Sequence, residues 1–183
     1  MKKLSFFFIA FIAFIFLFLL PAPNSKPDET QATNEAQRYT GSKEFERIKT
    51  LAGTWEGTSS MGEKGEKVSV KYQVTSGGSA VVETLFPDTP HEMVSVYDDE
   101  GGRLSMTHYC MLKNHPDMIL KSADENSINL DFADGQVFDP TKEPHMHSLS
   151  ISFTDKDNMV QAWTMYENGK EKEIATFTFS RLH

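Results

Sequence analysis

The sequence contains a single cysteine, Cys110, among its 183 residues. One thiol cannot form an intrachain disulfide, so the fold must be held together by its non-covalent core. The position of Cys110 also excludes a bacterial lipoprotein, because lipidation needs a cysteine directly after an N-terminal apolar segment.

Basic residues are scarce as well. There are 18 Lys and Arg against 26 Asp and Glu, a formal net charge of −8. Without the two N-terminal lysines the balance is 16 − 26 = −10. Such a surface repels phosphate backbones, so we expect no nucleic-acid partner. The sequence also lacks a glycine-rich phosphate loop, a nucleophile elbow and a paired-carboxylate spacing, so it shows no common catalytic motif.

The one long apolar run lies at residues 4–20, directly after two lysines. This arrangement predicts a signal peptide over residues 1–22. The run is also close to the length of about 20 apolar residues that spans a bilayer, and Pro23 makes cleavage after Ala22 unfavourable. We therefore expect a protein exported to the periplasm or the extracellular space, or one anchored to the membrane by residues 4–20. A membrane contact is expected only through this segment, if it is not cleaved.

Residues 23–41 are rich in Pro, Asn, Gln and Glu and have almost no apolar side chains. Such a segment buries too little surface to offset its ordering entropy, so it predicts a disordered linker. The remaining residues, 42–183, have the size of one ordinary domain. Ser42 can cap a short helix in which Phe45, Ile48 and Leu51 follow helical spacing, and Gly53 ends it.

Beyond this helix the sequence has no helical period. Short runs of alternating apolar and polar residues are separated by turn residues, which is typical of an all-β domain. The expected strands span residues 54–60, 67–75, 79–86, 91–98, 102–110, 117–122, 127–132, 145–154, 159–167 and 171–181. About ten sequential antiparallel strands predict an up-and-down barrel with a short N-terminal helix, because closure removes the exposed sheet edges.

The segment Leu51-Ala52-Gly53-Thr54-Trp55-Glu56-Gly57 opens the first expected strand, and Arg181 lies near the end of the last one. The segment resembles the Gly-x-Trp signature of the calycin (lipocalin-like) superfamily. Residues 42–183 are most similar to the nitrobindin-like barrels and related bacterial domains of unknown function. The resemblance implies a barrel in which Trp55 closes one end and packs against the guanidinium of Arg181. Both residues then have structural roles.

In such a barrel alternate loops lie at the same end. The tight loops after the second, fourth, sixth and eighth strands would lie at the Trp55 end, and the longer loops at the other end would surround the mouth. Most histidines fall at the expected mouth: His91, His108, His115, His145 and His147.

Side-chain alternation predicts which of these residues point inward. His108 and Cys110 share a face with Met106, and His145 and His147 share a face with Leu149. If no bulge interrupts either strand, all four point into the barrel. Imidazole and thiolate groups suit zinc, copper or haem iron, so His108, Cys110, His145 and His147 form a candidate metal site. The same residues can also be inward polar groups that satisfy one another by hydrogen bonds.

The leading hypothesis is a binding protein that holds a small hydrophobic molecule or a haem-like cofactor inside the barrel. The expected ligand-binding residues are Met106, His108, His147, Leu149, Ile151 and Phe153. Because nitrobindin-like barrels bind haem through an inward histidine, the resemblance implies that His145 or His147 holds a haem. Two alternatives stay open. One is a metal-dependent enzyme that uses the His/Cys cluster, and the other is a structural or interaction barrel with a filled core. We favour binding over catalysis.

Two further orientations follow from alternation. Glu83 lies in an apolar run, Ala80–Phe86, where an outward, solvated carboxylate is favoured over an inward acid with a raised pKa. Met146, between the two histidines, is expected to point outward.

Overall fold

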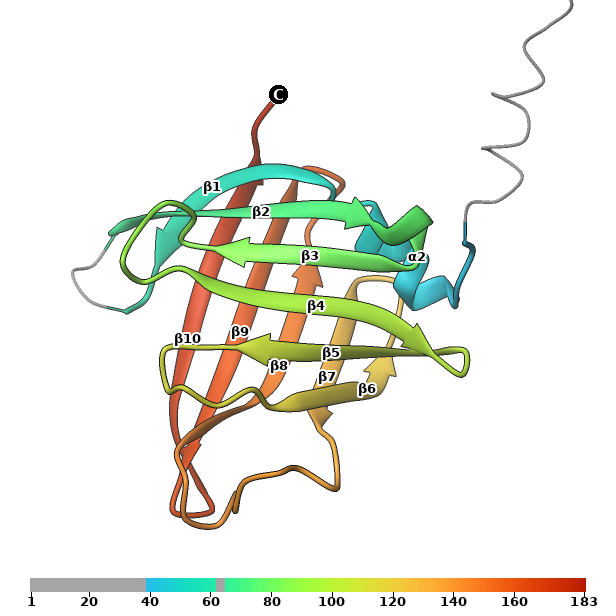
Figure 1. The fold of residues 1–183 in the computed structure, drawn as a ribbon. Coiled ribbons are helices and arrows are strands. Elements are labelled where there is room, and N and C mark those ends of the chain that lie inside the picture. Colours follow the sequence, from blue (N-terminus) through green and yellow to red (C-terminus); the bar gives the residue numbers. More distant parts are fainter. Residues whose placement is uncertain (1–38, 62–64) are drawn as a thin grey trace, which may run out of the picture.

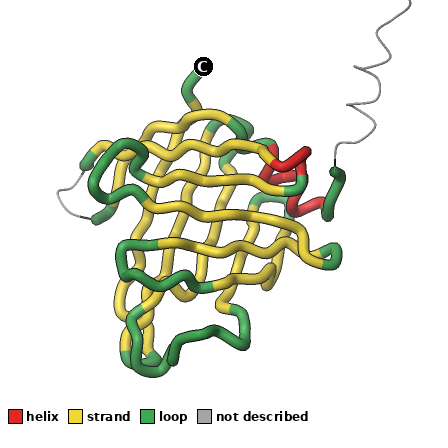
Figure 2. The backbone as a smooth tube through the Cα atoms, viewed as in Figure 1, coloured by secondary structure: helices red, strands yellow, loops and turns green. Residues whose placement is uncertain are grey.

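The computed structural model describes residues 39–61 and 65–183. The predicted signal peptide or anchor at residues 1–22 lies outside the described residues, as does nearly all of the predicted linker. In the described part of the chain, ten antiparallel strands close into a barrel, and one short α-helix lies at its N-terminal side (Figures 1 and 2). The expected fold class is confirmed.

The helix and strands follow one another along the chain in a simple order. They are α2 (Lys43–Lys49), β1 (Gly53–Ser59), β2 (Lys67–Thr75), β3 (Ala80–Leu85), β4 (Met93–Glu100), β5 (Arg103–Tyr109), β6 (Asp117–Ala123), β7 (Ser127–Phe132), β8 (His145–Phe153), β9 (Asn158–Glu167) and β10 (Lys170–Arg181), with a 3₁₀ turn at Ser76–Gly78 between β2 and β3. Each strand begins and ends within two residues of its predicted position. Every strand pairs with its neighbours in the sequence, and β1 pairs with β10 to close the barrel.

Two glycines of the first strand permit this closure. Gly53 has a φ of +128°, a backbone conformation that other residues rarely adopt. At Gly57 an added Cβ would lie 1.9 Å from the carbonyl oxygen of Thr178 on β10. Any larger residue at position 57 would therefore push β1 and β10 apart.

The end of the barrel beside α2 is sealed. Ser42 caps the helix by accepting a hydrogen bond from the backbone N–H of Phe45, and Phe45 and Ile48 are fully buried. The Arg181 guanidinium lies 4.2 Å from the centre of the Trp55 ring, as the resemblance implied. It also donates hydrogen bonds of 2.8 Å to the carbonyl oxygens of Ala52 and Thr50, which follow the helix. The helix, the first strand and the last strand are thus joined at this end.

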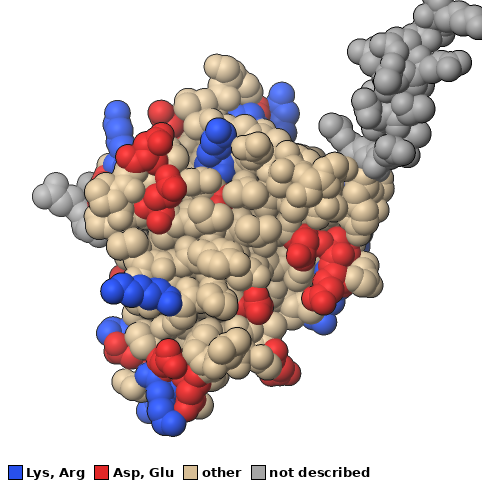
Figure 3. Space-filling view, in the orientation of Figure 1, with Lys and Arg blue, Asp and Glu red and all other residues tan. Residues whose placement is uncertain are grey.

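No helix among the described residues is long and apolar enough to cross a membrane. The face shown in Figure 3 carries both Lys or Arg and Asp or Glu side chains, spread over several strands and loops.

Candidate functional site

A cavity of about 600 Å³ lies at the end of the barrel opposite α2. Its walls come from β1, β2, β3, β4, β5, β8, β9 and β10 and from the loops that follow β1, β3 and β5. The lining residues are Ser59, Met61, Glu66, Lys67, Val68, Leu85, Phe86, Thr89, His91, Met93, His108, Cys110, Met111, Leu112, Met146, Trp163, Met165, Glu173, Ala175 and Phe177. The cavity therefore lies at the predicted mouth, which the loops after odd-numbered strands surround.

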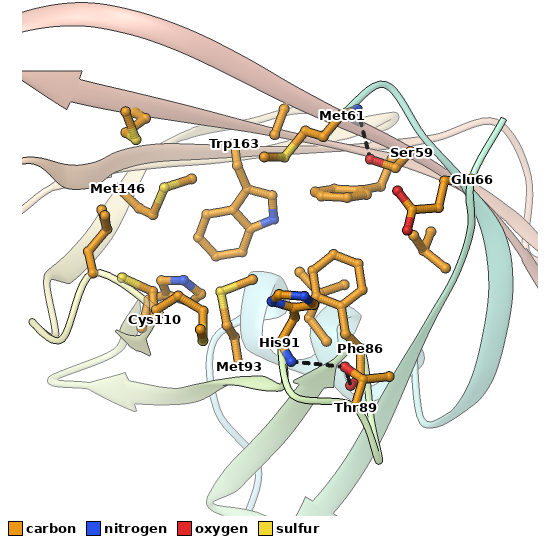
Figure 4. Close-up of a pocket in the computed structure, with 18 of the residues that line it drawn as sticks. Ser59, Met61, Glu66, Phe86, Thr89, His91, Met93, Cys110, Met146 and Trp163 are labelled. Carbon is orange, nitrogen blue, oxygen red and sulfur yellow. Dashed lines mark hydrogen bonds between the residues drawn. The ribbon is translucent and has the colours of Figure 1, made fainter. Parts of the chain in front are cut away.

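The lining is dominated by sulfur-containing and aromatic side chains. It includes five methionines, namely Met61, Met93, Met111, Met146 and Met165, and three aromatic rings, those of Phe86, Trp163 and Phe177. Figure 4 shows Trp163 in the middle of this lining, with Met93, Met146 and Cys110 around it. Within residues 39–61 and 65–183, the charged lining residues are Glu66, Lys67 and Glu173, and all three are solvent-exposed. Charge therefore lies at the rim of the cavity, and its interior is largely apolar.

The lining contains two buried polar residues, Ser59 and His108, and His108 is the more deeply buried of them. Only 2% of its surface is exposed, and its ring centroid lies 4.4 Å from that of Trp163. Its Nδ1 lies 3.0 Å from the Ser95 hydroxyl, which fixes the ring orientation. Burial lowers the pKa of His108 to about 4, so the imidazole is neutral at neutral pH.

The other ring nitrogen of His108, Nε2, makes no hydrogen bond to any residue that the structure describes. Among the described residues, Asp99 Oδ1 is the sole solvent-inaccessible side-chain polar atom that lacks a hydrogen-bond partner. His108 Nε2 also lacks a partner, so it is not solvent-inaccessible. The open space beside His108 is the cavity that it lines. Nε2 is therefore available to a molecule in the cavity.

Behind His108, a row of polar side chains crosses the barrel interior. Tyr72 on β2 pairs with Glu83 on β3, Glu83 with Ser95 on β4, and Ser95 with His108 on β5. All four residues are at most 2% exposed. Because directly paired residues share one face of the sheet, the four side chains form a continuous polar belt below the cavity.

Gln161 connects this belt to the cavity floor from the opposite wall. Its side-chain amide donates to the Tyr72 hydroxyl and, at 3.4 Å, to Glu83. Its carbonyl oxygen accepts the indole N–H of Trp163 at 3.1 Å. The Tyr97 hydroxyl donates to the second Glu83 oxygen at 2.5 Å. Trp163 is thereby held between the cavity and a buried hydrogen-bond network.

The expected outward orientation of Glu83 is wrong. Val81, Glu83 and Leu85 are buried and face the interior, and Glu83 is only 1% exposed. Burial raises its pKa, and hydrogen bonds from Tyr97, Tyr72 and Gln161 oppose that shift. The β3 run is apolar on both faces, so alternation could not show which face is the inner one.

The expected inward orientation of His145 and His147 is also wrong, and a β-bulge explains it. On β8, Met146 pairs with Met165 and Ser148 with Thr164, so His147 is an extra residue in the ladder. Met146 and Met165 both line the cavity, whereas His145 pairs with Tyr166 on the opposite face. The bulge reverses the alternation, so Met146 points inward, contrary to expectation.

The two histidines instead form an aromatic cluster on the outer face of the barrel. His145 Nε2 lies 3.1 Å from His147 Nδ1, and the His147 ring stacks on Tyr166 with centroids 3.7 Å apart. Phe132 and Phe138 pack against the fully buried His145. Burial lowers the pKa of His147. The cluster is thus separate from the cavity.

The four predicted metal ligands are consequently divided between two places. His108 and Cys110 line the cavity, and His145 and His147 lie outside the barrel wall. The Cys110 thiol lies 3.6 Å from the side-chain oxygen of Asn114, and burial raises its pKa. No three His, Cys, Asp or Glu side chains within residues 39–61 and 65–183 are grouped so as to hold a metal ion.

Of the six expected ligand-binding residues, only His108 lines the cavity. Met106, Leu149 and Ile151 face inward but lie deeper, in the packed core, where each is at most 1% exposed. Phe153 lies near the sealed end, with the Arg47 guanidinium 3.9 Å from its ring centre. Alternation predicts which face a residue occupies, but it does not predict the depth at which the interior becomes hollow.

The sequence did not lead us to Trp163, Met93, Met165 or the polar belt. For Trp163 a pattern was available, because Met159, Gln161, Trp163 and Met165 alternate along β9 and so share one face. The belt was not detectable, because it depends on the register between four strands.

No family model and no curated protein sequence matches this chain. Among solved structures it is similar to a protein of unknown function of the DUF3598 family from Nostoc punctiforme, with a TM-score of 0.50 and 14% sequence identity. The match covers 74% of this chain and 49% of that one, so this chain corresponds to about half of its structural neighbour. At this identity the likeness supports the barrel fold alone.

Proposed function

We propose that the protein binds a small, largely apolar molecule in the cavity at the open end of the barrel. The observation that supports this proposal is the cavity itself, about 600 Å³ in volume and lined mainly by methionine, aromatic and aliphatic side chains. Its volume lies within the range of roughly 300–1,000 Å³ that small-molecule sites occupy. The resemblance of the Gly53–Trp55 segment to calycins, whose barrels hold ligands, supports the same proposal.

The two alternatives have weaker support. An enzyme with a metal at the His/Cys cluster would need several converging ligands, and His145 and His147 lie on the outer face. A barrel with a wholly filled core is hard to reconcile with an empty volume of this size, since protein interiors are normally close-packed.

A haem-like ligand is one member of the proposed class. His145 and His147 do not fit the role of an inward haem ligand, because they lie outside the barrel. His108 fits it by chemistry, since its imidazole is neutral, is oriented by Ser95 and has a free Nε2 at the cavity. A haem would supply redox or gas-binding chemistry, and an absorbance band near 400 nm in the purified protein, a region where side chains do not absorb, would reveal it.

The cavity can be tested by filling it. Ala175 is buried, faces the cavity and pairs with Trp163, so Ala175→Phe places a ring in the open volume. Ala162, on the outer face of β9, offers the matched control Ala162→Phe. We expect the full-length chain and the Ala162 variant to bind naphthalene in equilibrium dialysis, and the Ala175 variant to bind at least tenfold more weakly. Equal binding by all three proteins, or by none, would contradict the proposal.

We further propose that the domain acts outside the cytoplasm, on the strength of the signal-like residues 1–22 alone. The native protein should begin between Ala22 and Lys26 or retain its N-terminal segment, without a lipid adduct. Mass spectrometry that finds a diacylglycerol-modified chain would contradict this.

A further inference from the structure

The cavity has two kinds of wall. One is a layer of polarisable thioether and aromatic groups, including Met93, Met146, Trp163 and Phe86. Methionine sulfur interacts favourably with aromatic rings, and aromatic rings interact favourably with one another in edge-to-face arrangements. Phe86 already packs edge-on against Phe177, with ring centroids 5.7 Å apart. These groups favour a flat, aromatic ligand over a saturated one of equal size.

The other kind of wall is polar, and its most deeply buried member is His108. His108 presents Nε2 to the cavity, while its Nδ1 is held by Ser95, which lies in the polar belt next to Glu83. The ring also packs on Trp163, so it cannot easily turn away. A fixed imidazole nitrogen in a nearly apolar chamber pairs best with one hydroxyl group of a ligand, which can donate or accept whichever ring nitrogen carries the proton. An unpaired polar atom would lose its hydrogen bond to water when a ligand covers it.

Among the residues that the structure describes, the buried part of the lining offers no charge of either sign. The acidic and basic lining residues lie at the solvent-exposed rim, and burial keeps His108 neutral. A ligand with a charged group beside His108 would lose its hydration without gaining a counter-ion, which is costly.

From these observations we propose that the site is selective for an uncharged aromatic molecule that carries one hydrogen-bonding group directed at His108 Nε2. This inference rests on the proposed function and adds the chemical class of the ligand. His91 also lines the cavity, but it is solvent-exposed at the mouth and is not oriented by a buried partner.

Four probes of similar size test the three parts of the proposal by equilibrium dialysis against the full-length chain at pH 7. They are naphthalene, 1-naphthol, its saturated counterpart decahydro-1-naphthol, and the anion 1-naphthoate. We expect 1-naphthol to bind about three- to tenfold more tightly than naphthalene, the value of one neutral hydrogen bond. The saturated alcohol and the anion should each bind more weakly than 1-naphthol, the anion at least tenfold so.

Variants test whether His108 is the residue that makes 1-naphthol bind more tightly than naphthalene. His108→Phe keeps a ring against Trp163 and should make naphthalene and 1-naphthol bind equally, whereas His91→Phe should leave the preference unchanged. If His108→Phe does not fold, Ser95→Ala, which frees the ring without removing it, should reduce the preference.

The possible outcomes distinguish a failure of the proposed function from a failure of the inference about ligand class. Failure of all four probes to bind would overturn the proposed function itself. Binding of naphthalene without a preference for 1-naphthol, equal binding of the anion or the saturated alcohol, or a preference lost in the His91 variant would overturn only the inference about ligand class.

Discussion

The two ends of this barrel are built differently. At the end beside α2, Trp55 is 1% exposed, Phe45 and Ile48 are fully buried, and Arg181 ties the helix to the last strand. At the opposite end, the walls surround a cavity of about 600 Å³, and the lining residues Met61 and Met111 are more than 40% exposed. The difference indicates that one end stabilises the fold and the other is available for binding.

The polar belt from Tyr72 to His108 lies between these two regions. Buried polar groups are costly unless they are hydrogen-bonded, and the belt satisfies its members through Gln161, Tyr97 and Ser95. The belt therefore pairs the polar groups behind the cavity and leaves His108 Nε2 as the member that is free at the cavity itself.

The largest expected effect concerns the sealed end. Trp55→Ala should lower the free energy of unfolding by about 3–5 kcal/mol, because it removes a large, fully packed ring. Arg181→Ala should cost less and should be sub-additive with it, since both residues form the same contact. Urea denaturation of the two single variants and the double variant measures this. Strictly additive losses would show that the Trp55–Arg181 contact does not couple the strands.

The next effect concerns pH at the boundary. The pKa of His108 falls from 6.5 to about 4 on folding, so the unfolded chain binds its proton more tightly. The stability that this shift contributes is present above pH 6.5 and is lost as the pH falls toward 4, about 3 kcal/mol in total. Between pH 7 and pH 4, the free energy of unfolding should therefore fall less in the His108→Phe variant than in the unmodified protein. Parallel pH profiles for the two proteins would contradict a buried, neutral His108.

A smaller effect is expected at Glu83. Glu83→Ala leaves the Tyr97 and Tyr72 hydroxyls without their acceptor and should cost about 1–3 kcal/mol at neutral pH, whereas Glu56→Ala on the exposed outer face should cost less than about 0.5 kcal/mol.

The pH dependence at Glu83 has the opposite sign to that at His108. Because the folded pKa is raised above 4.5, the native state holds the proton more tightly, and stability falls as the pH rises from 4.5 through the folded value. Glu83→Gln, which cannot titrate, should lack this decline. The same decline in both proteins, measured by thermal unfolding, would argue against a raised pKa of the inward Glu83 carboxyl.

The smallest effect is expected in the wall of the cavity. Met93→Ala should cost only about 1 kcal/mol, because this side chain already borders empty space, whereas Met118→Ala in the packed core should cost about 2–5 kcal/mol. Equal losses in thermal unfolding would mean that the two ends are packed alike.

These regions also differ in how far the sequence predicted them. The strands, the Ser42 cap and the Trp55–Arg181 contact were predicted, because alternation, turn residues and one short motif are local signals. The candidate site was predicted only in part, through His108 and Cys110. The wrong orientations predicted for His145, His147 and Met146 share one cause, the bulge at His147. The residues around the bulge are all suitable for a regular strand, so the sequence does not show where the alternation is interrupted.

Methionines at the two ends of the barrel report directly on where a ligand binds. Met61, Met93, Met111, Met146 and Met165 line the cavity, whereas Met106, Met118 and Met159 are at most 1% exposed in the packed core. In a chain labelled with ¹³C-methyl methionine, titration with 1-naphthol should shift the five cavity resonances and leave the three core resonances in place. Shifts confined to the core methionines, or no shift at a concentration where dialysis shows binding, would contradict a ligand site at the open end.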